Sequence, residues 1–204
     1  MSIFRPSVLD IISVMNKKAY RVFDTPDAPW NLNIVGIRNN PSSAKTFDDT
    51  IVVFHQIVGD WDVTYYPVTV DPSAKYLKKP VNSKGTAILK PGQYLSVYEI
   101  NTHKQNQPGA HTALCQRLGE VTVYRDNNKN GELNFVNPES GFFGINIHRG
   151  PKNGDYDSDN DIYSAGCQVF ADRDQFEEFM LKCEKGRAAF GNSFSYTLLE
   201  GTDF

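Results

Sequence analysis

Residues 50–70 read TIVVFHQIVGDWDVTYYPVTV, two runs rich in β-branched and aromatic residues on either side of Val58-Gly59-Asp60. β-Branched and aromatic side chains favour the extended backbone, because they fit a pleated, half-buried surface. Glycine and aspartate interrupt the pattern, as they do between neighbouring strands. This stretch therefore predicts two strands and places the chain among β proteins.

The same pattern recurs along the rest of the chain. Each further run is short, rich in the same residue types and bounded by Gly, Pro, Asn or Asp. These runs are GTAILK at 85–90, QYLSVYEI at 93–100, EVTVYR at 120–125, GFFGINIH at 141–148 and SFSYTLLE at 193–200. Such a series predicts a mainly β fold, a sandwich or a barrel-like sheet, with a few flanking helices.

Two helices are expected, one near each end of the chain. The first covers roughly residues 7–18, and the second opens at Asp172 with Gln175 three residues later as a capping pair. In the second helix an apolar stripe recurs at helical spacing and includes Cys183, which is therefore predicted to lie in the core with Cys115. The stripe consists of Phe176, Phe179, Met180 and Cys183.

The domain boundary is predicted at the loop-forming sequence Asn39-Asn40-Pro41-Ser42-Ser43. Residues 1–43 then form an N-terminal helical appendage, and residues 44–204 form the main domain. A chain of 204 residues is long enough to bury a core without metals or disulfides. Three cysteines form no even framework and have no zinc-site spacing, so neither feature is expected.

Charge and hydropathy exclude several classes of partner. The formal net charge of −3 gives no reason to expect nucleic-acid or anionic-membrane binding. The first twenty residues lack the uninterrupted apolar run of a secretory signal, and no segment has the length of a transmembrane helix. We therefore expect synthesis in the cytoplasm without an export signal. The oligomeric state stays open.

The stretch most suggestive of chemistry is INIHRGPKNGDYDSDNDIYSAGCQVF at residues 145–170. Strand alternation places Ile145 and Ile147 on one face, and Asn146 and His148 on the other. Gly150 and Pro151 end this strand. A turn of small residues, Ser164-Ala165-Gly166, then leads into Cys167. A histidine and a cysteine are thus joined through one acid-rich loop.

Histidine beside cysteine suggests nucleophilic catalysis. An imidazole can take the thiol proton, and we expect His148 to hydrogen-bond Cys167 and to depress its pKa. The backbone amides of Gly166 and Cys167 could then stabilise the oxyanion of an acyl transfer. The alternative is a buried cysteine beside an ordinary loop histidine. The other histidines, His55, His103 and His111, are interpreted as incidental.

The order His148, fifteen residues, then Ser164-Ala165-Gly166-Cys167 resembles the catalytic domain of the L,D-transpeptidases of the YkuD type. That family carries a histidine, a variable loop and then Ser/Thr-His-Gly-Cys. Residues 50–72 are similar to its opening hairpin, and LKPGQYLSVYEI at 89–100 to its Pro-x-Gly-x-Phe/Tyr strand entry. The segment also resembles uncharacterised, often phage-encoded proteins with an INIHR…SAGCQVF core.

The resemblance implies a fold, a reaction and a set of roles. Cys167 would be the nucleophile that attacks a peptidoglycan stem-peptide carbonyl, and His148 would accept its proton. Gly166 would help to form the oxyanion hole. Ser164 would support the turn or orient His148, or would be a plain turn residue. No cofactor is required.

Two positions depart from that family's motif. Ala165 stands where the family has a second histidine, and Gln168-Val169 replaces a segment that usually carries Asn or Arg. Gln168, Arg149 and Arg173 are then the candidates for binding substrate in place of the missing arginine. The alternative for Arg149 is an exposed, solvated charge.

A second motif, RDNNKNGELNF at residues 125–135, follows the start of a calcium-binding loop. Alternate oxygen-bearing side chains precede a glycine that permits the tight turn, although Asn137 stands where a bidentate Glu is usual. A structural calcium ion is therefore possible, and a hairpin of turn-forming residues is the alternative. The candidate ligands are Asp126, Asn128, Asn130 and Glu132. The acidic run GDYDSDND at 154–161 is interpreted as a cation site or a solvated flap.

The leading functional hypothesis is a cysteine-dependent acyl-transfer enzyme acting on peptidoglycan stem peptides. Without an export signal, a phage-delivered or lysis-released cell-wall hydrolase, an endolysin, is favoured over a cross-linking transpeptidase. The alternative hypothesis is a non-catalytic wall-binding or phage virion structural module that retains the fold with a decayed site. Labelling of Cys167 with a thiol reagent distinguishes the two.

Overall fold

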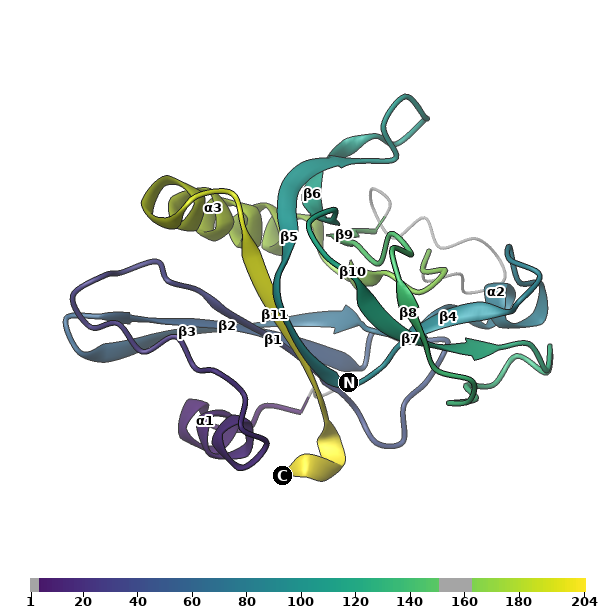
Figure 1. Ribbon diagram of the computed structural model, residues 1–204, viewed down its shortest axis with the longest axis horizontal. Coiled ribbons are helices and arrows are strands. Elements are labelled where there is room, and N and C mark those ends of the chain that lie inside the picture. The colour runs from purple at the N-terminus through teal and green to yellow at the C-terminus, as the bar shows by residue number, and fades with distance from the viewer. Residues whose placement is uncertain (1–3, 151–162) are drawn as a thin grey trace.

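A computed structural model describes residues 4–150 and 163–204, and eight of their strands close into a barrel (Figure 1). Neighbouring strands pair in a mixed order, with β1 parallel to β11 and β9 parallel to β10. In order around the barrel the strands are β1 (Asn33–Arg38), β11 (Phe194–Glu200), β5 (Gly92–His103), β6 (His111–Gln116), β9 (Ile147–Arg149), β10 (Gln168–Phe170), β3 (Asp60–Thr69) and β2 (Asp49–Ile57). The predicted mainly β class is confirmed, and it takes the form of a barrel.

The hairpin at residues 50–70 forms two long barrel strands. β2 and β3 pair antiparallel from Asp49 opposite Val68 to Ile57 opposite Asp60. Alternate residues of β2 enter different cores: Ile51 and Val53 face the barrel interior, and the residues between them face outward into a second cluster. Because both faces are covered, this strand is an apolar run rather than an alternation of apolar and polar residues.

A second sheet lies beside the barrel and contains β4 (Thr86–Leu89), β7 (Val121–Asp126) and β8 (Glu139–Gly141). The single strand predicted at 141–148 is divided between the two sheets. β8 ends at Gly141, and β9 begins at Ile147 in the barrel. Between them the Gln116 side chain accepts hydrogen bonds from the amides of Phe143 and Ile145, both at 3.1 Å. Local composition does not reveal this change of sheet.

Both expected helices are present. α1 (Val8–Lys17) begins after Ser7, and α3 (Arg173–Phe190) begins after Asp172, whose carboxylate accepts the Gln175 amide at 2.8 Å. The apolar stripe of α3 is buried as predicted, Cys183 included, and Cys115 is buried in β6. Two short helices, α2 (Ala74–Lys78) and η2 (Gly201–Asp203), are also present among the described residues. No helix of the described residues is long and apolar enough to cross a bilayer.

The expected appendage over residues 1–43 is not a separate unit. β1 is one of the strands of the barrel itself, and it pairs with β2 on one side and with β11 on the other. α1 packs on the outer face of the same strands through Ile11, Val14 and Met15. Asn39–Ser43 is therefore a loop within the domain. The prediction of a domain boundary here is wrong, because turn-forming residues also occur in a loop between two strands of one domain, as they do between β1 and β2.

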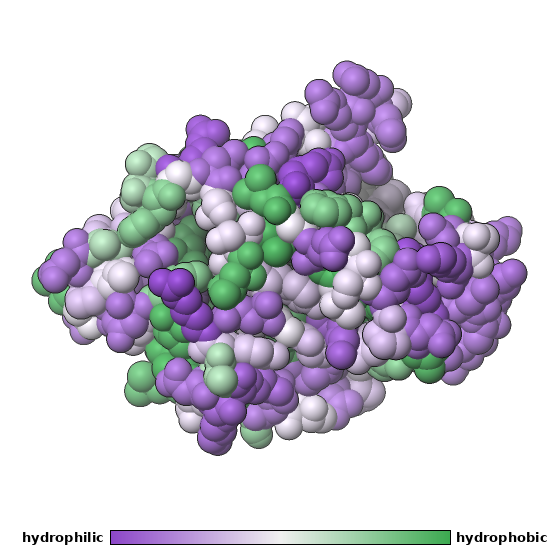
Figure 2. Space-filling model, viewed as in Figure 1, coloured by the Kyte–Doolittle hydropathy of each residue, from purple (hydrophilic) through white to green (hydrophobic). Residues whose placement is uncertain are grey.

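The hairpin between β5 and β6 projects from the body of the molecule (Figure 1). Its tip is exposed and hydrophilic (Figure 2), and it carries Lys104 immediately after β5. The base of the same hairpin pairs His103 with His111. The hairpin thus brings two histidines and a cation to the end of the barrel at which β9 carries His148.

Candidate active site

The turn that carries the cysteine is held by its own serine. Ser164 Oγ donates to the carbonyl of Cys167 at 2.7 Å and accepts the Gly166 amide at 3.1 Å. The Ser164 carbonyl in turn accepts the amide of Ser73 at 2.8 Å. Of the roles considered for Ser164, supporting the turn is the one that these contacts describe.

Gly166 is required for the shape of this turn. Its φ of +128° lies in a region that L side chains rarely adopt, and an added Cβ would lie 2.4 Å from the carbonyl oxygen of Ala87 in β4. Its amide, which we expected in an oxyanion hole, donates to Ser164 Oγ instead. The expected oxyanion contribution of the Gly166 amide is therefore not what the structure shows, and the amide of Cys167 itself is the remaining candidate.

Cys167 immediately precedes β10, and His148 lies in β9, the parallel neighbour of β10 in the barrel. The Cα partner of Gln168 is Ile147, so Cys167 stands just before and His148 just after one paired position. Side chains alternate across a strand, and adjacent strands are about 4.8 Å apart. The segment between the two residues, 151–162, contains the predicted acidic flap and lies outside the described residues.

The thiol of Cys167 is a neutral hydrogen-bond donor in this arrangement. Its Sγ donates to the carbonyl of Gly144 at 3.4 Å, and among the described residues this bond takes the place of the one expected with His148. Burial raises the pKa of the thiol, while the backbone amide of Asn146 and the charge of Lys104 act against that rise. The expectation that His148 depresses the thiol pKa is therefore wrong for this state of the site.

His148 is buried and oriented by the backbone. Its Nδ1 lies 2.8 Å from the carbonyl oxygen of Arg149. A carbonyl oxygen can only accept, so Nδ1 carries the proton and Nε2 has the free lone pair. Burial lowers the pKa of His148 well below its ordinary value, and His103 lowers it further. The imidazole is therefore a neutral base with a fixed tautomer.

Sequence reasoning missed the histidine cluster around this base. The rings of His103 and His148 are stacked with centroids 4.1 Å apart, and His111 lies 5.3 Å from His103 and 6.0 Å from His148. Asn146 Nδ2 donates to His103 Nδ1 at 3.0 Å, which fixes the His103 ring. The signal available in the sequence was the hairpin register that pairs His103 with His111, but their contact with β9 is tertiary.

The three residues proposed to bind substrate are divided between two environments. Arg149 and Arg173 line one pocket of about 420 Å³ together with His111, and burial and the charge of Arg173 lower the pKa of Arg149. Gln168 instead points into the barrel, where it accepts the Tyr196 hydroxyl at 3.1 Å and donates to the Gly166 carbonyl at 3.4 Å. β10 is buried on both faces, so the Gln168 side chain lies in the barrel interior and contacts the turn from there.

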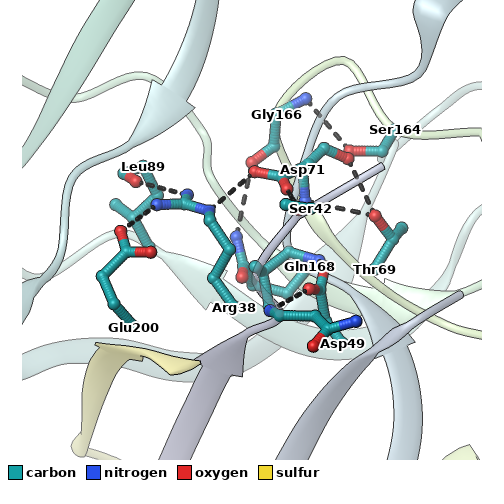
Figure 3. A network of polar contacts seen from close by, with 12 residues as sticks. Arg38, Ser42, Asp49, Thr69, Asp71, Leu89, Ser164, Gly166, Gln168 and Glu200 are labelled. Carbon is teal, nitrogen blue, oxygen red and sulfur yellow. Dashed lines mark hydrogen bonds and ion pairs between the residues drawn. The ribbon is translucent and has the colours of Figure 1, made fainter. Parts of the chain in front are cut away.

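A buried ion-pair network lies beneath the turn and was not predicted. Arg38 contacts Asp71 and Glu200, each at 2.9 Å, and donates to the Leu89 carbonyl at 2.8 Å. Figure 3 shows these contacts together with Ser164, Gly166 and Gln168. Ser73, two residues after Asp71, donates to the Ser164 carbonyl. The network joins β1, β11 and the end of β4 to the segment that holds the turn.

The proposed calcium loop begins at the end of β7, and its side-chain oxygens accept hydrogen bonds from backbone amides of the same loop. Asp126 accepts the amides of Asn128 and Asn134, at 3.2 and 3.0 Å. Asn128 accepts the amide of Asn130, which accepts that of Glu132. These bonds account for the residue pattern without a metal. Within the described residues no group of three or more His, Cys, Asp or Glu is arranged to hold a metal ion, and calcium binding stays a prediction.

Comparison with family models, with curated proteins and with solved structures finds no match. The function must therefore be argued from the chemistry of the site itself.

Proposed function

We propose that this protein is a cysteine-dependent acyl-transfer enzyme of L,D-transpeptidase-like fold that acts on peptidoglycan stem peptides. The observation that carries the proposal is the parallel pairing of β9 and β10, in which Gln168 pairs with Ile147, so that Cys167 comes one residue before and His148 one residue after this pair. The Nδ1 contact of His148 with a carbonyl leaves Nε2 as the base. The peptidoglycan substrate follows from the motif resemblance.

The reaction begins with both groups neutral. As Sγ of Cys167 attacks the peptide carbonyl, its proton passes to Nε2 of His148, and the carbonyl oxygen becomes an oxyanion. The bond from sulfur to Gly144 is given up, and the Asn146 amide, which favours the charged sulfur, remains beside it. Collapse of the intermediate expels the amine, which takes the proton from His148. Water, or a second amine, then releases the acyl group.

A neutral base and a neutral thiol suit a concerted transfer. A buried ion pair would be costly to form before substrate arrives, because both charges must leave water. The stack with His103 and the charge of Lys104 both disfavour the protonated imidazole. The His148 imidazolium formed in the reaction is therefore a strong acid toward the leaving amine.

One observation favours a second candidate function, a wall-binding or virion structural module. The thiol has a raised pKa and is bonded to a main-chain carbonyl, as in an inert buried cysteine. In that case the fold would present a binding surface and the cysteine would only fill space. The two functions differ in whether Cys167 becomes covalently attached to the peptide.

The test is incubation with muropeptides that carry tetrapeptide or pentapeptide stems, with and without an added D-amino acid. We expect an intact-protein mass adduct that is absent in Cys167→Ala and in His148→Gln, and present in the control Cys115→Ala. Each of the two active-site substitutions should cost nearly as much as both together, because the pair acts as one unit. Shortened peptides identify a hydrolase, and incorporation of the D-amino acid identifies a transpeptidase.

If no adduct forms while Cys167→Ala binds cell walls as well as the unmodified protein, the binding-module function is correct. If neither adduct nor wall binding is found, both proposals fail.

A further inference from the structure

A second pocket, of about 490 Å³, opens between the small sheet and the turn that carries the cysteine. Ala165, the exposed residue of that turn, lines it, and so do Thr86 and Ala87 of β4. Gly166 packs so closely on β4 that a Cβ there would lie 2.4 Å from the Ala87 oxygen. The pocket wall and the nucleophile turn are therefore in direct contact. Its volume is within the range of small-ligand sites.

The described part of the pocket lining carries one charged group, Arg125 of β7. Its guanidinium is almost buried, lies 4.7 Å from the Phe143 ring centroid and donates to Glu139 at 3.1 Å and to the Gly85 carbonyl at 3.2 Å. Glu139 is shared with Lys84 at 2.8 Å. Two cations thus share one carboxylate, and of the two only Arg125 lines the pocket.

The remaining lining favours a peptide rather than a bare ion. Tyr76, Phe142 and Phe143 supply aromatic surface, and Asn82 supplies an amide. Phe142 is 61% exposed, so it offers apolar contact that the protein itself does not use. Aromatic walls with one buried arginine match a short peptide that carries a carboxylate, since arginine binds carboxylates in a bidentate manner.

We propose that this pocket binds a carboxylate-bearing segment of the peptide substrate, with Arg125 as the residue that recognises the carboxylate. The inference rests on the proposed function, because it places the bound segment beside the carbonyl that Cys167 attacks. Ala165, which stands where the motif has a second histidine, lines the same pocket, and its small side chain takes up little of the space there. Arg149 and Arg173 belong to the other pocket, next to His111.

The experiment measures binding without turnover, in the Cys167→Ala background. The probes are a tetrapeptide muropeptide with free carboxyl groups and the same muropeptide with those groups amidated, each titrated by calorimetry. We expect the free acid to bind about ten- to a hundredfold more tightly, as for a charge-assisted hydrogen bond. Arg125→Gln should abolish this preference and Arg125→Lys should retain part of it. The control Arg187→Gln, on the exposed face of α3, should leave it unchanged.

Ala165→Phe provides an independent test that leaves the buried arginine in place. A phenyl ring at this lining position should take up space in the pocket and weaken binding of both probes at least about tenfold, the scale expected when several apolar contacts are lost. The inference is overturned if Cys167→Ala binds acid and amide equally, or if Ala165→Phe binds like its parent. Failure of acylation with the acid preference intact would instead disprove the enzyme and leave the pocket assignment standing.

Discussion

The ring of His103 lies parallel to the ring of His148, with centroids 4.1 Å apart and an interplanar angle of 16°. The two rings come from β5 and β9, which are not neighbours in the barrel. Burial, His111 and Lys104 lower the pKa of His103 to about 4, and burial and His103 lower that of His148. Both imidazoles therefore stay neutral at neutral pH, and a proton on either is opposed by the other.

This stack predicts a specific dependence of stability on pH. A histidine with a lowered pKa in the folded state contributes stability that is present above its unfolded pKa and is lost as the pH falls through it. Each such histidine should therefore cost about 1 kcal/mol of the free energy of unfolding between pH 6.5 and 5.5. In His103→Phe, which keeps a stacked ring but cannot be protonated, this pH-dependent loss should be smaller by about that amount.

Urea unfolding at the two pH values measures the difference. Asp48, Asp49 and Glu200 have pKa values raised by burial and act in the opposite sense, so the comparison is made between the variant and the unmodified protein. Equal losses in both proteins would show that His103 titrates as an ordinary exposed histidine.

Alkylation of Cys167 should keep accelerating as the pH rises above neutrality. The reactive form is the thiolate, and burial raises the pKa of this thiol. Iodoacetamide labelling, followed by mass spectrometry of the Cys167 peptide, should show no plateau below pH 8. A plateau near pH 6 would reveal a thiolate–imidazolium pair and contradict the neutral resting site.

A second comparison tests the electrostatics around the thiol. Lys104 lowers the pKa of Cys167, so Lys104→Gln should slow labelling at any given pH below that pKa. Lys129→Gln is the matched control, since Lys129 is an equally exposed lysine in the loop after β7. Indistinguishable rates for the two variants would rule out a role for the hairpin cation.

Gly166→Ala should destabilise the protein by at least about 3 kcal/mol. The added methyl would lie 2.4 Å from the Ala87 oxygen at a φ of +128°, so the clash and the backbone strain both contribute. Gly109→Ala is the control, with a φ of +83° and no atom within 4 Å of the added methyl, and should cost about 1 to 2 kcal/mol. Denaturant unfolding measures the loss in the free energy of unfolding for each variant. Equal losses would show that the turn changes shape to accommodate the added methyl.

Arg38→Leu should lower the free energy of unfolding by about 3–5 kcal/mol, because it leaves Asp71 buried without its cation. The exposed pair between Arg187 and Glu184 provides the comparison, and Arg187→Gln should cost less than about 1 kcal/mol. A small effect of Arg38→Leu in guanidinium unfolding would mean that Asp71 is protonated once its partner is removed.

The sequence by itself determined the local elements of this protein. Strand runs such as residues 50–70, the helix starts at Ser7 and Asp172, and the burial of Cys183 follow from side-chain period and capping, which act over a few residues. The alternation in β9 placed His148 on the face opposite Ile147 by the same means. These features can be predicted from the sequence because each depends on residues that are close together in the chain.

Only the tertiary structure decided which distant elements meet. It made β1 a strand of the barrel, directed the Gln168 side chain inward to a hydrogen bond with the Tyr196 hydroxyl and stacked the His103 ring on that of His148. It also directed the Gly166 amide to Ser164 and the Cys167 thiol to Gly144. Strand pairing and register join residues far apart in sequence, and their choice depends on packing of the whole barrel. Burial produced by that packing, rather than residue type, sets the protonation of the proposed catalytic pair.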